Sequence, residues 1–351
     1  MSNMKKVQRN SSIELYRILA MLFVLIVHCN GWFVGGIPDN FDENNITMFR
    51  VSQATIQAFT CTCVNMFLLI SGYFGLKFKW KSILNIYLLL ISVTIPFYLI
   101  SCFLGESFSI SQLLRRFMAI SRSGYFVECY LLLMFFSPVF NSFIEKMGKE
   151  MIAWVLVFWL IEVYFEFLLN DEDLGFKRGY SIIHFILIYM IGRTLFLYKD
   201  SLLQISSYKY ICLYILFTLT ILALYMGLDM PYAYSYSSPF NILATCSFFM
   251  LFAKQTFYNH WINWIASSTF AVYIIHVNKP IFTWLRIFDN RILSNFSYPK
   301  YLLIMGGAIL LLFIGSILYD KVAKLFTTPI IRAAGNYFPI IKQKLYVFKI
   351  I

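Results

Sequence analysis

Residues 15–34 read LYRILAMLFVLIVHCNGWFV, an apolar run interrupted by one arginine and one histidine. A helix of about 20 residues rises about 30 Å, which is the thickness of the hydrocarbon core of a bilayer. We therefore expect this run to be a transmembrane helix. The basic residues before it are typical of a signal peptide, but no small-residue cleavage site follows the run, so we expect an uncleaved first helix.

Further apolar runs follow along most of the 351 residues, of which 60% are hydrophobic and only 13% charged. The mean hydropathy is +0.71, and a soluble fold of this size could not bury that much apolar surface. The chain is therefore expected to be an all-α polytopic membrane protein with about ten transmembrane helices. The expected spans are 15–35, 53–74, 83–104, 125–143, 151–169, 180–198, 209–228, 239–254, 267–285 and 301–319.

Charge in the connecting segments predicts the orientation. The net charge is +12, and Lys and Arg are concentrated on the side that carries the N-terminus, whereas Asp and Glu lie mostly on the other side. The positive-inside rule then places both termini in the cytoplasm. We expect a transmembrane domain over 1–320, a basic amphipathic cytoplasmic tail over 321–351, and a short amphipathic surface helix within 105–124.

Two ionisable residues in the first run, Arg17 and His28, carry the main functional signal. Eleven residues at 100° each end about 20° from three full turns, so both side chains lie on one helix face, about 16 Å apart along the axis. An arginine at the cytoplasmic mouth can bind phosphate, and a buried histidine can accept a proton from a hydroxyl group. The alternative for Arg17 is that it extends to the lipid headgroups and pairs with Glu14.

Other polar residues in apolar runs are weaker candidates. His276 is expected near mid-membrane, where it could line the same cavity as His28 or form a hydrogen bond to a neighbouring helix. Glu128 could orient an imidazole or a sugar, and we count His276 and Glu128 with His28 as candidate catalytic residues. Glu162 could also orient an imidazole or a sugar, and with Glu166 it suggests a polar cavity or a proton path. His184, near an outer helix end, favours a wet or interfacial role. The segment with Lys77 and Lys79 could bind a phosphate-rich ligand, or provide positive-inside charge. The cysteines show no metal-ligand spacing, so no metal is expected.

Several segments resemble the acyltransferase 3 family of bacterial membrane O-acyltransferases. The Arg-x10-His pattern within SSIELYRILAMLFVLIVHCNGW (11–32) resembles the signature of the first helix of that family. VNMFLLISGYFGLK (64–77), which includes Ser71, resembles its second-helix segment, and GYFVECYLLLMFFSPVFN (124–141) resembles its Ser-Pro segment. SPFNILATCSFFMLF and INWIASSTFAVYIIHV resemble later segments, the last ending beside His276. The resemblance covers about residues 11–320.

The resemblance implies transfer of an acyl group, usually acetyl, from cytoplasmic acyl-CoA to a hydroxyl of a glycan or lipid-linked sugar. It implies that Arg17 helps to bind the donor and that His28 is catalytic. We assign Ser71, Lys77 and Lys79 to the donor site as well, although many family members have an Arg-x-x-Arg pattern where this chain has Lys77 and Lys79. Acetyl-CoA is the expected co-substrate.

The expected partners are acyl-CoA, a glycan or lipid-linked sugar acceptor and membrane lipid, in a bacterial inner or plasma membrane. The sequence is compatible with a homodimer, and binding of nucleic acid is not expected. The rival hypothesis is a transporter or flippase of a lipid-linked glycan, since multiple spans with buried acids suit that class too.

Overall fold

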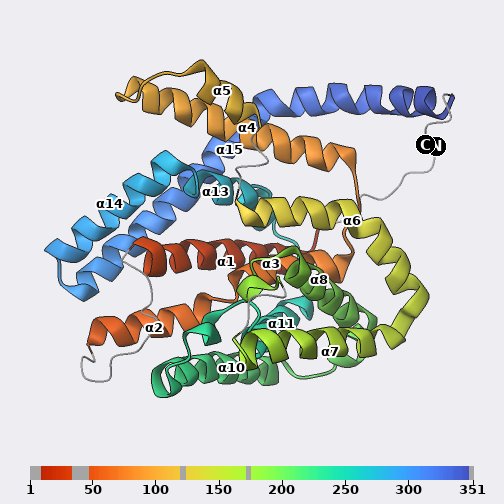
Figure 1. The fold of residues 1–351 in the computed structure, drawn as a ribbon, viewed down its shortest axis with the longest axis vertical. Helices are drawn as coiled ribbons and strands as arrows, with labels where there is room; N and C mark the ends of the chain where they lie inside the picture. The colour runs from red at the N-terminus through yellow and green to blue at the C-terminus, as the bar shows by residue number, and fades with distance from the viewer. Residues whose placement is uncertain (1–8, 34–46, 119–123, 171–174, 348–351) are drawn as a thin grey trace.

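The computed structural model describes residues 9–33, 47–118, 124–170 and 175–347, and within these ranges the chain forms helices and no strands. Figure 1 shows their arrangement. The longer helices, in chain order, are α1 (Ser11–His28), α2 (Met48–Thr60), α3 (Cys63–Phe74), α4 (Trp80–Phe103), α5 (Ile110–Phe117), α6 (Tyr125–Met147), α7 (Met151–Glu162), α8 (Ile182–Leu197), α10 (Ser207–Leu228), α11 (Pro239–Ala253), α12 (His260–Ala266), α13 (Thr269–His276), α14 (Lys279–Asn295) and α15 (Tyr298–Val347). The short ones are η1 (Cys29–Phe33), η4 (Gly148–Glu150), η5 (Val163–Leu168), η6 (Lys177–Gly179), α9 (Lys199–Leu202) and η7 (Pro231–Tyr234).

Among the described residues, 7 helical segments are long and apolar enough to cross a membrane. One of them, Tyr125–Leu168, contains most of the two expected spans 125–143 and 151–169. The short helix η4 separates α6 from α7 within it, and the chain bends there (Figure 1). Gly148 adopts a positive φ of 53° at this bend, a conformation that glycine adopts without steric cost. The expected span at 180–198 corresponds to α8, which is apolar but shorter. The protein is thus an all-α membrane protein, and the count of about ten spans stays a prediction.

The expected span at 267–285 is not one helix. It is divided between α13, which ends at His276, and α14, which begins at Lys279. Pro280 lies in the first turn of α14, and a proline restricts the residue before it and cannot donate a backbone hydrogen bond to a preceding turn. The interruption therefore leaves His276 at the end of a short helix, inside the protein.

The last helix is longer than the sequence suggested. α15 runs without interruption through residue 320, where we expected the membrane domain to give way to a tail, and it contains Pro329. Figure 1 shows it changing direction along its length, so that its later part passes beside α4. Of the expected surface helix within 105–124, the structure contains α5, and residues 119–123 lie outside the described ranges.

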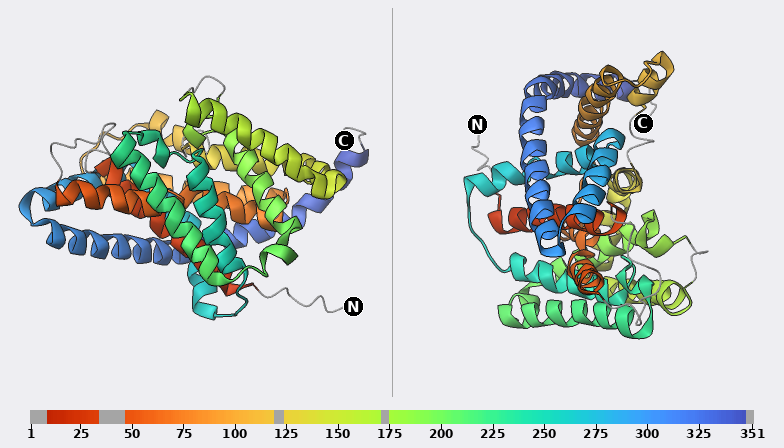
Figure 2. Two further views of the ribbon diagram at one scale, coloured as in Figure 1. Left: turned by 90° about the horizontal axis from the view of Figure 1, so that it is seen from below. Right: turned by 90° about the vertical axis from the view of Figure 1, so that its left-hand side faces the viewer.

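Helix α1 lies at the centre of the bundle. It packs against α3, α11, α12 and α13, and Figure 2 shows these helices around it from two further directions. Its large side chains Tyr16, Met21 and Leu25 are fully buried, although the helix is apolar enough to have faced lipid. A functional group on α1 is therefore surrounded by protein.

Helices α3 and α8 cross in backbone contact because each carries a glycine at the crossing point. A Cβ atom added to Gly72 would lie 2.3 Å from the carbonyl oxygen of Tyr189, and one added to Gly192 would lie 2.7 Å from that of Leu69. Small residues at a helix crossing let two backbones approach closely in a membrane protein. This crossing fixes the position of the α3 segment that contains Phe67 and Ser71.

Candidate active site

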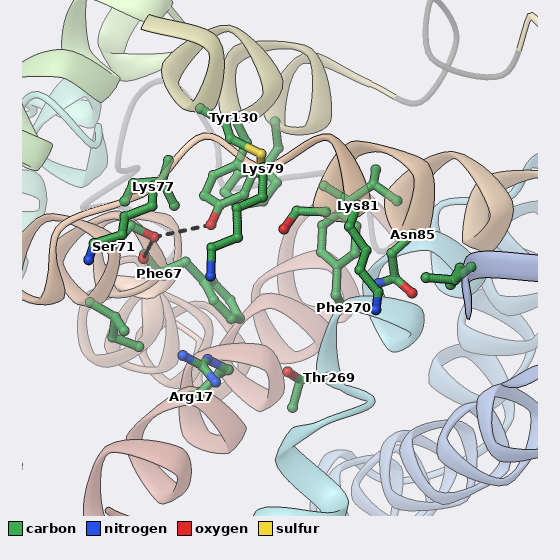
Figure 3. A pocket seen from close by; sticks show the side chains of 17 residues that line it. Arg17, Phe67, Ser71, Lys77, Lys79, Lys81, Asn85, Tyr130, Thr269 and Phe270 are labelled. Carbon is green, nitrogen blue, oxygen red and sulfur yellow. Dashed lines mark hydrogen bonds between the residues drawn. The ribbon is translucent and has the colours of Figure 1, made fainter. Parts of the chain in front are cut away.

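A cavity of about 530 Å³ opens beside the start of α1, and we call it the basic cavity. Its wall contains the side chains of Arg17, Lys77, Lys79 and Lys81, together with Ser71 and Tyr130. Figure 3 shows Arg17 on α1 and the three lysines, which precede or begin α4, around one space. The structure thus brings the four donor-site residues predicted from the sequence, Arg17, Ser71, Lys77 and Lys79, to one cavity.

Arg17 has both of the features considered from the sequence. Its Nη1 lies 2.6 Å from Oε2 of Glu14, in an ion pair between residues three apart on α1. Its side chain is 30% exposed, whereas that of Glu14 is 8% exposed. The guanidinium therefore has an ion-pair partner below it and still presents donors to the basic cavity, since it carries five N–H groups.

Ser71 is held in place by its own helix. Its Oγ donates to the carbonyl oxygen of Phe67 at 3.1 Å and lies 3.4 Å from the hydroxyl of Tyr130 (Figure 3). The hydroxyl hydrogen is thus used within the wall, and the oxygen lone pairs remain as acceptors toward the cavity or Tyr130.

A second cavity, of about 680 Å³, adjoins the basic cavity and lies beside the C-terminal half of α1. His28 lines it, and so do five tyrosines, so we call it the tyrosine cavity. The five are Tyr125, Tyr180, Tyr234, Tyr236 and Tyr273. Gln57 and Arg178 add polar groups to the wall. The tyrosines come from four regions that are far apart in the sequence, and no sequence pattern indicates that they share a wall.

The two histidines predicted from the sequence contact each other directly. Nδ1 of His28 lies 2.8 Å from Nε2 of His276, and both residues are buried. Nδ1 of His276 in turn lies 3.0 Å from the carbonyl oxygen of Val272, one turn earlier on α13. The two histidines are 248 positions apart in the chain, and the packing of α13 against α1 brings them together.

These contacts assign the hydrogens on both rings. A carbonyl oxygen can only accept, so Nδ1 of His276 carries a hydrogen, and in the neutral ring Nε2 is then an acceptor. Nδ1 of His28 must therefore donate to it. The remaining nitrogen of His28, Nε2, is then the acceptor nitrogen of the neutral ring. His276 thus fixes the tautomer of His28, as an orienting group does for a catalytic histidine.

The family model for an acyltransferase domain, Acyl_transf_3, matches residues 10–321. The chain belongs to the acyltransferase 3 family. Searches of curated proteins and of solved structures gave no significant match. The matched region contains both cavities except for Ile331 of the basic cavity, and it contains both histidines of this acyltransferase domain.

Glu128 is not brought to the histidine pair of the acyltransferase. Its side chain is exposed on the first turn of α6, and it is not among the described residues that line either cavity. His28 does contact His276. Within the described part of the chain, no group of three or more His, Cys, Asp and Glu residues could hold a metal ion.

A buried polar cluster lies apart from these residues, and for His184 the expected wet or interfacial position is wrong. The side chains of His184 and Glu162 are 0% exposed. Nδ1 of His184 lies 2.7 Å from Oε1 of Glu162, and its Nε2 lies 2.8 Å from Oδ1 of Asn65. Asn65, inside the apolar run of α3, was the signal in the sequence that could have indicated a buried partner. Nearby, Glu166 accepts from the backbone N–H of Arg178 at 2.6 Å and from Ser237 at 3.0 Å.

Proposed function

We propose that this acyltransferase moves an acetyl group from acetyl-CoA to a hydroxyl of a cell-surface or lipid-linked glycan, in a bacterial cell membrane. The observation that supports this most is the contact of His28 with His276 in the wall of the tyrosine cavity, next to a separate cavity with four cationic side chains. A donor with several phosphates suits the basic cavity, and His28 in the wall of the tyrosine cavity suits a catalytic base or nucleophile.

The basic cavity suits coenzyme A. The molecule carries a pyrophosphate and a further phosphate, and Arg17, Lys77, Lys79 and Lys81 could neutralise these groups. Arginine binds phosphate through a fork of two N–H donors, and lysine binds it as a mobile point charge. The three lysines are exposed, so they can follow a ligand that enters from the cytoplasm.

The tyrosine cavity suits a sugar acceptor. A tyrosine presents an apolar ring face and a hydroxyl that donates and accepts hydrogen bonds, which matches the apolar faces and hydroxyl rim of a pyranose. Gln57 and Arg178 add donors. A sugar hydroxyl in this cavity can approach His28, which lines it.

His28 can act in two ways, and both use the lone pair on Nε2. As a general base, it removes the proton of the sugar hydroxyl while the sugar oxygen attacks the thioester carbonyl, and the C–S bond breaks to release CoA thiolate, which then takes a proton. As a nucleophile, Nε2 attacks the thioester carbonyl, CoA thiolate leaves, and the sugar oxygen then takes the acyl group while its proton goes to the imidazole. In both schemes His276 holds the hydrogen bond to Nδ1.

Radiolabelled acetyl-CoA and the purified full chain in detergent test this function. We expect saturable binding that unlabelled CoA displaces, followed by transfer of the label to a lipid-linked glycan fraction from the cells that express the protein. A flippase of lipid-linked glycans would ignore acetyl-CoA. Absence of saturable binding to a folded, monodisperse sample would overturn the proposal.

Replacing Arg17 with Ala should raise the dissociation constant for CoA at least tenfold, because a hydrogen bond to a charged group contributes about 1.5–3 kcal/mol. Isothermal calorimetry or a radioligand competition with CoA would measure it. Glu14→Gln is the control for loss of the ion pair, and Arg286→Ala is the control for loss of an exposed arginine outside both cavities. Both controls should stay within about twofold of the parent. Unchanged CoA affinity in Arg17→Ala would mean that this arginine serves only to anchor the helix end.

A further inference from the structure

Three phenylalanines separate the basic cavity from the tyrosine cavity. Phe67, Phe126 and Phe270 are the only described residues that line both cavities. They come from three different helices, α3, α6 and α13. Every other described residue that lines one of these two cavities does not line the other, so these three side chains lie at the boundary between the two spaces. We call them the phenylalanine partition.

The partition follows from the register of the helices. On α3, Val64 faces the tyrosine cavity, Phe67 faces both, and Ser71 faces the basic cavity. Residues three or four apart lie one above another on one helix face, so α3 runs along both cavities and crosses the boundary at Phe67. On α13 the same face carries Phe270 at the boundary and Tyr273 one turn further, in the tyrosine cavity.

Two rings of the partition, Phe67 and Phe126, pack against each other, and Tyr273 connects Phe126 with Phe270. The ring centroids of Phe67 and Phe126 are 6.1 Å apart in an edge-to-face arrangement. Phe126 lies 5.3 Å from Tyr273, and Tyr273 is stacked on Phe270 at 6.2 Å. Phe126 is only 6% exposed. Aromatic rings from three helices therefore lie at the boundary between the cavities.

Such a layer discriminates by chemistry and by size. Phosphates and the adenosine moiety cannot enter an apolar aromatic layer without losing their hydration, whereas a short acyl group is apolar and thin. Phe67 and Phe270 are half-buried, so their rings have room to rotate on one side. The acyl group must pass this layer, because His28 lines only the tyrosine cavity and the four cations line only the basic cavity.

We propose that Phe67, Phe126 and Phe270 determine which acyl chains the enzyme transfers, by admitting an acetyl thioester to His28 and excluding longer acyl chains and the adenosine and phosphate part of coenzyme A. This inference rests on the proposed function, since it requires a thioester in the basic cavity and an acceptor near His28. The three residues are specificity determinants here and take no part in bond making or breaking.

The test compares donors in one assay. The parent protein and Phe270→Ala are given acetyl-CoA, butyryl-CoA and hexanoyl-CoA in turn, and acyl transfer to the glycan fraction is measured for each. We expect Phe270→Ala to raise the rate ratio of hexanoyl to acetyl transfer at least about tenfold, in line with the discrimination that a pocket achieves for each methylene group. Phe270→Leu, which removes less volume, should give a smaller rise and serves if the alanine variant does not fold.

Phe252→Ala is the matched control, because Phe252 is also a half-buried phenylalanine of the bundle but lines neither cavity. Its donor ratio should equal that of the parent. If Phe270→Ala or Phe270→Leu transfers acetyl groups and keeps the parent ratio, the partition does not select the acyl chain, although the enzyme function stands. If the parent transfers no acyl group from any of the three donors, the proposed function itself fails.

Discussion

Replacing His28 with Gln is expected to lower acyl transfer at least about a hundredfold, the contribution typical of a positioned general base, and further if Nε2 is the nucleophile. Glutamine can still donate a hydrogen bond toward His276, but its amide nitrogen has no lone pair for a proton or an acyl carbon. The variant should therefore keep its fold and lose its chemistry. Transfer of radiolabelled acetyl from acetyl-CoA to glycan is the measurement.

The control for His28→Gln is His260→Gln. His260 is the first residue of α12, it is exposed, and it lines neither cavity. The His260→Gln variant should transfer acetyl at the rate of the parent protein. Binding of CoA should be equal in all three proteins, because we propose the basic cavity as the donor site and neither histidine lines it. Acetyl transfer by His28→Gln at the parent rate, with equal protein in the membrane, would remove His28 from the mechanism.

The sequence predicted the relation of Arg17 to His28 but not the relation of His28 to His276. Arg17 and His28 belong to one helix, so the helical period alone places them on one face. The distance between His28 and His276 depends on how α13 packs against α1, and no local rule supplies that. The sequence suggested that both histidines lie near mid-depth and could line one cavity, but not that they contact each other.

The interruption between α13 and α14 shows where counting apolar residues fails. Residues 267–285 are apolar enough to predict one span, but they contain Pro280, which hydropathy does not take into account. Proline permits a helix to begin again at its own position and disfavours continuation from the residue before. The break positions His276 against His28, so the feature that hydropathy missed is part of the candidate site.

The cationic residues were easier to predict than the shape of the space that they line. Lys77 and Lys79 lie in a short connection, and local charge was enough to suggest a phosphate site. The tyrosine cavity was missed, because Tyr125, Tyr236 and Tyr273 lie on separate segments and tyrosine is common throughout this chain. A side chain that is frequent and amphipathic gives no sequence signal that distinguishes a cavity wall from a membrane interface.

In the buried cluster around His184, the neighbouring hydrogen bonds determine that Nε2 of His184 carries a hydrogen. Nδ2 of Asn65 donates to the carbonyl oxygen of Tyr236 at 2.9 Å and to Oδ1 of Asn241 at 3.1 Å, so Oδ1 of Asn65 must be the atom that faces His184. Nε2 of His184 therefore carries a hydrogen. Its Nδ1 faces Glu162, and one proton lies between the two groups.

Replacing Glu162 with Ala should destabilise the protein by about 3–5 kcal/mol, the cost of removing one partner from a buried pair. His184 would lose its hydrogen-bond partner at Nδ1, and a void would form where α7 packs against α8. Glu162→Gln should be milder, because the glutamine amide can donate to Nδ1 of a neutral His184 that still donates to Asn65. Thermal unfolding in detergent, followed by fluorescence-detected size exclusion, measures both.

The matched control is Glu145→Ala, on the exposed face of α6, which should unfold at the temperature of the parent. The order parent, Glu162→Gln, Glu162→Ala in unfolding temperature is the expected result. Equal unfolding of Glu162→Ala and the parent would mean that the pair contributes nothing to stability. Asn65 also donates a hydrogen bond to the backbone of Tyr236, a wall residue of the tyrosine cavity. Loss of the His184–Glu162 pair would therefore change the wall of the tyrosine cavity through α8 and α3. It would not act through the histidine pair on α1 and α13.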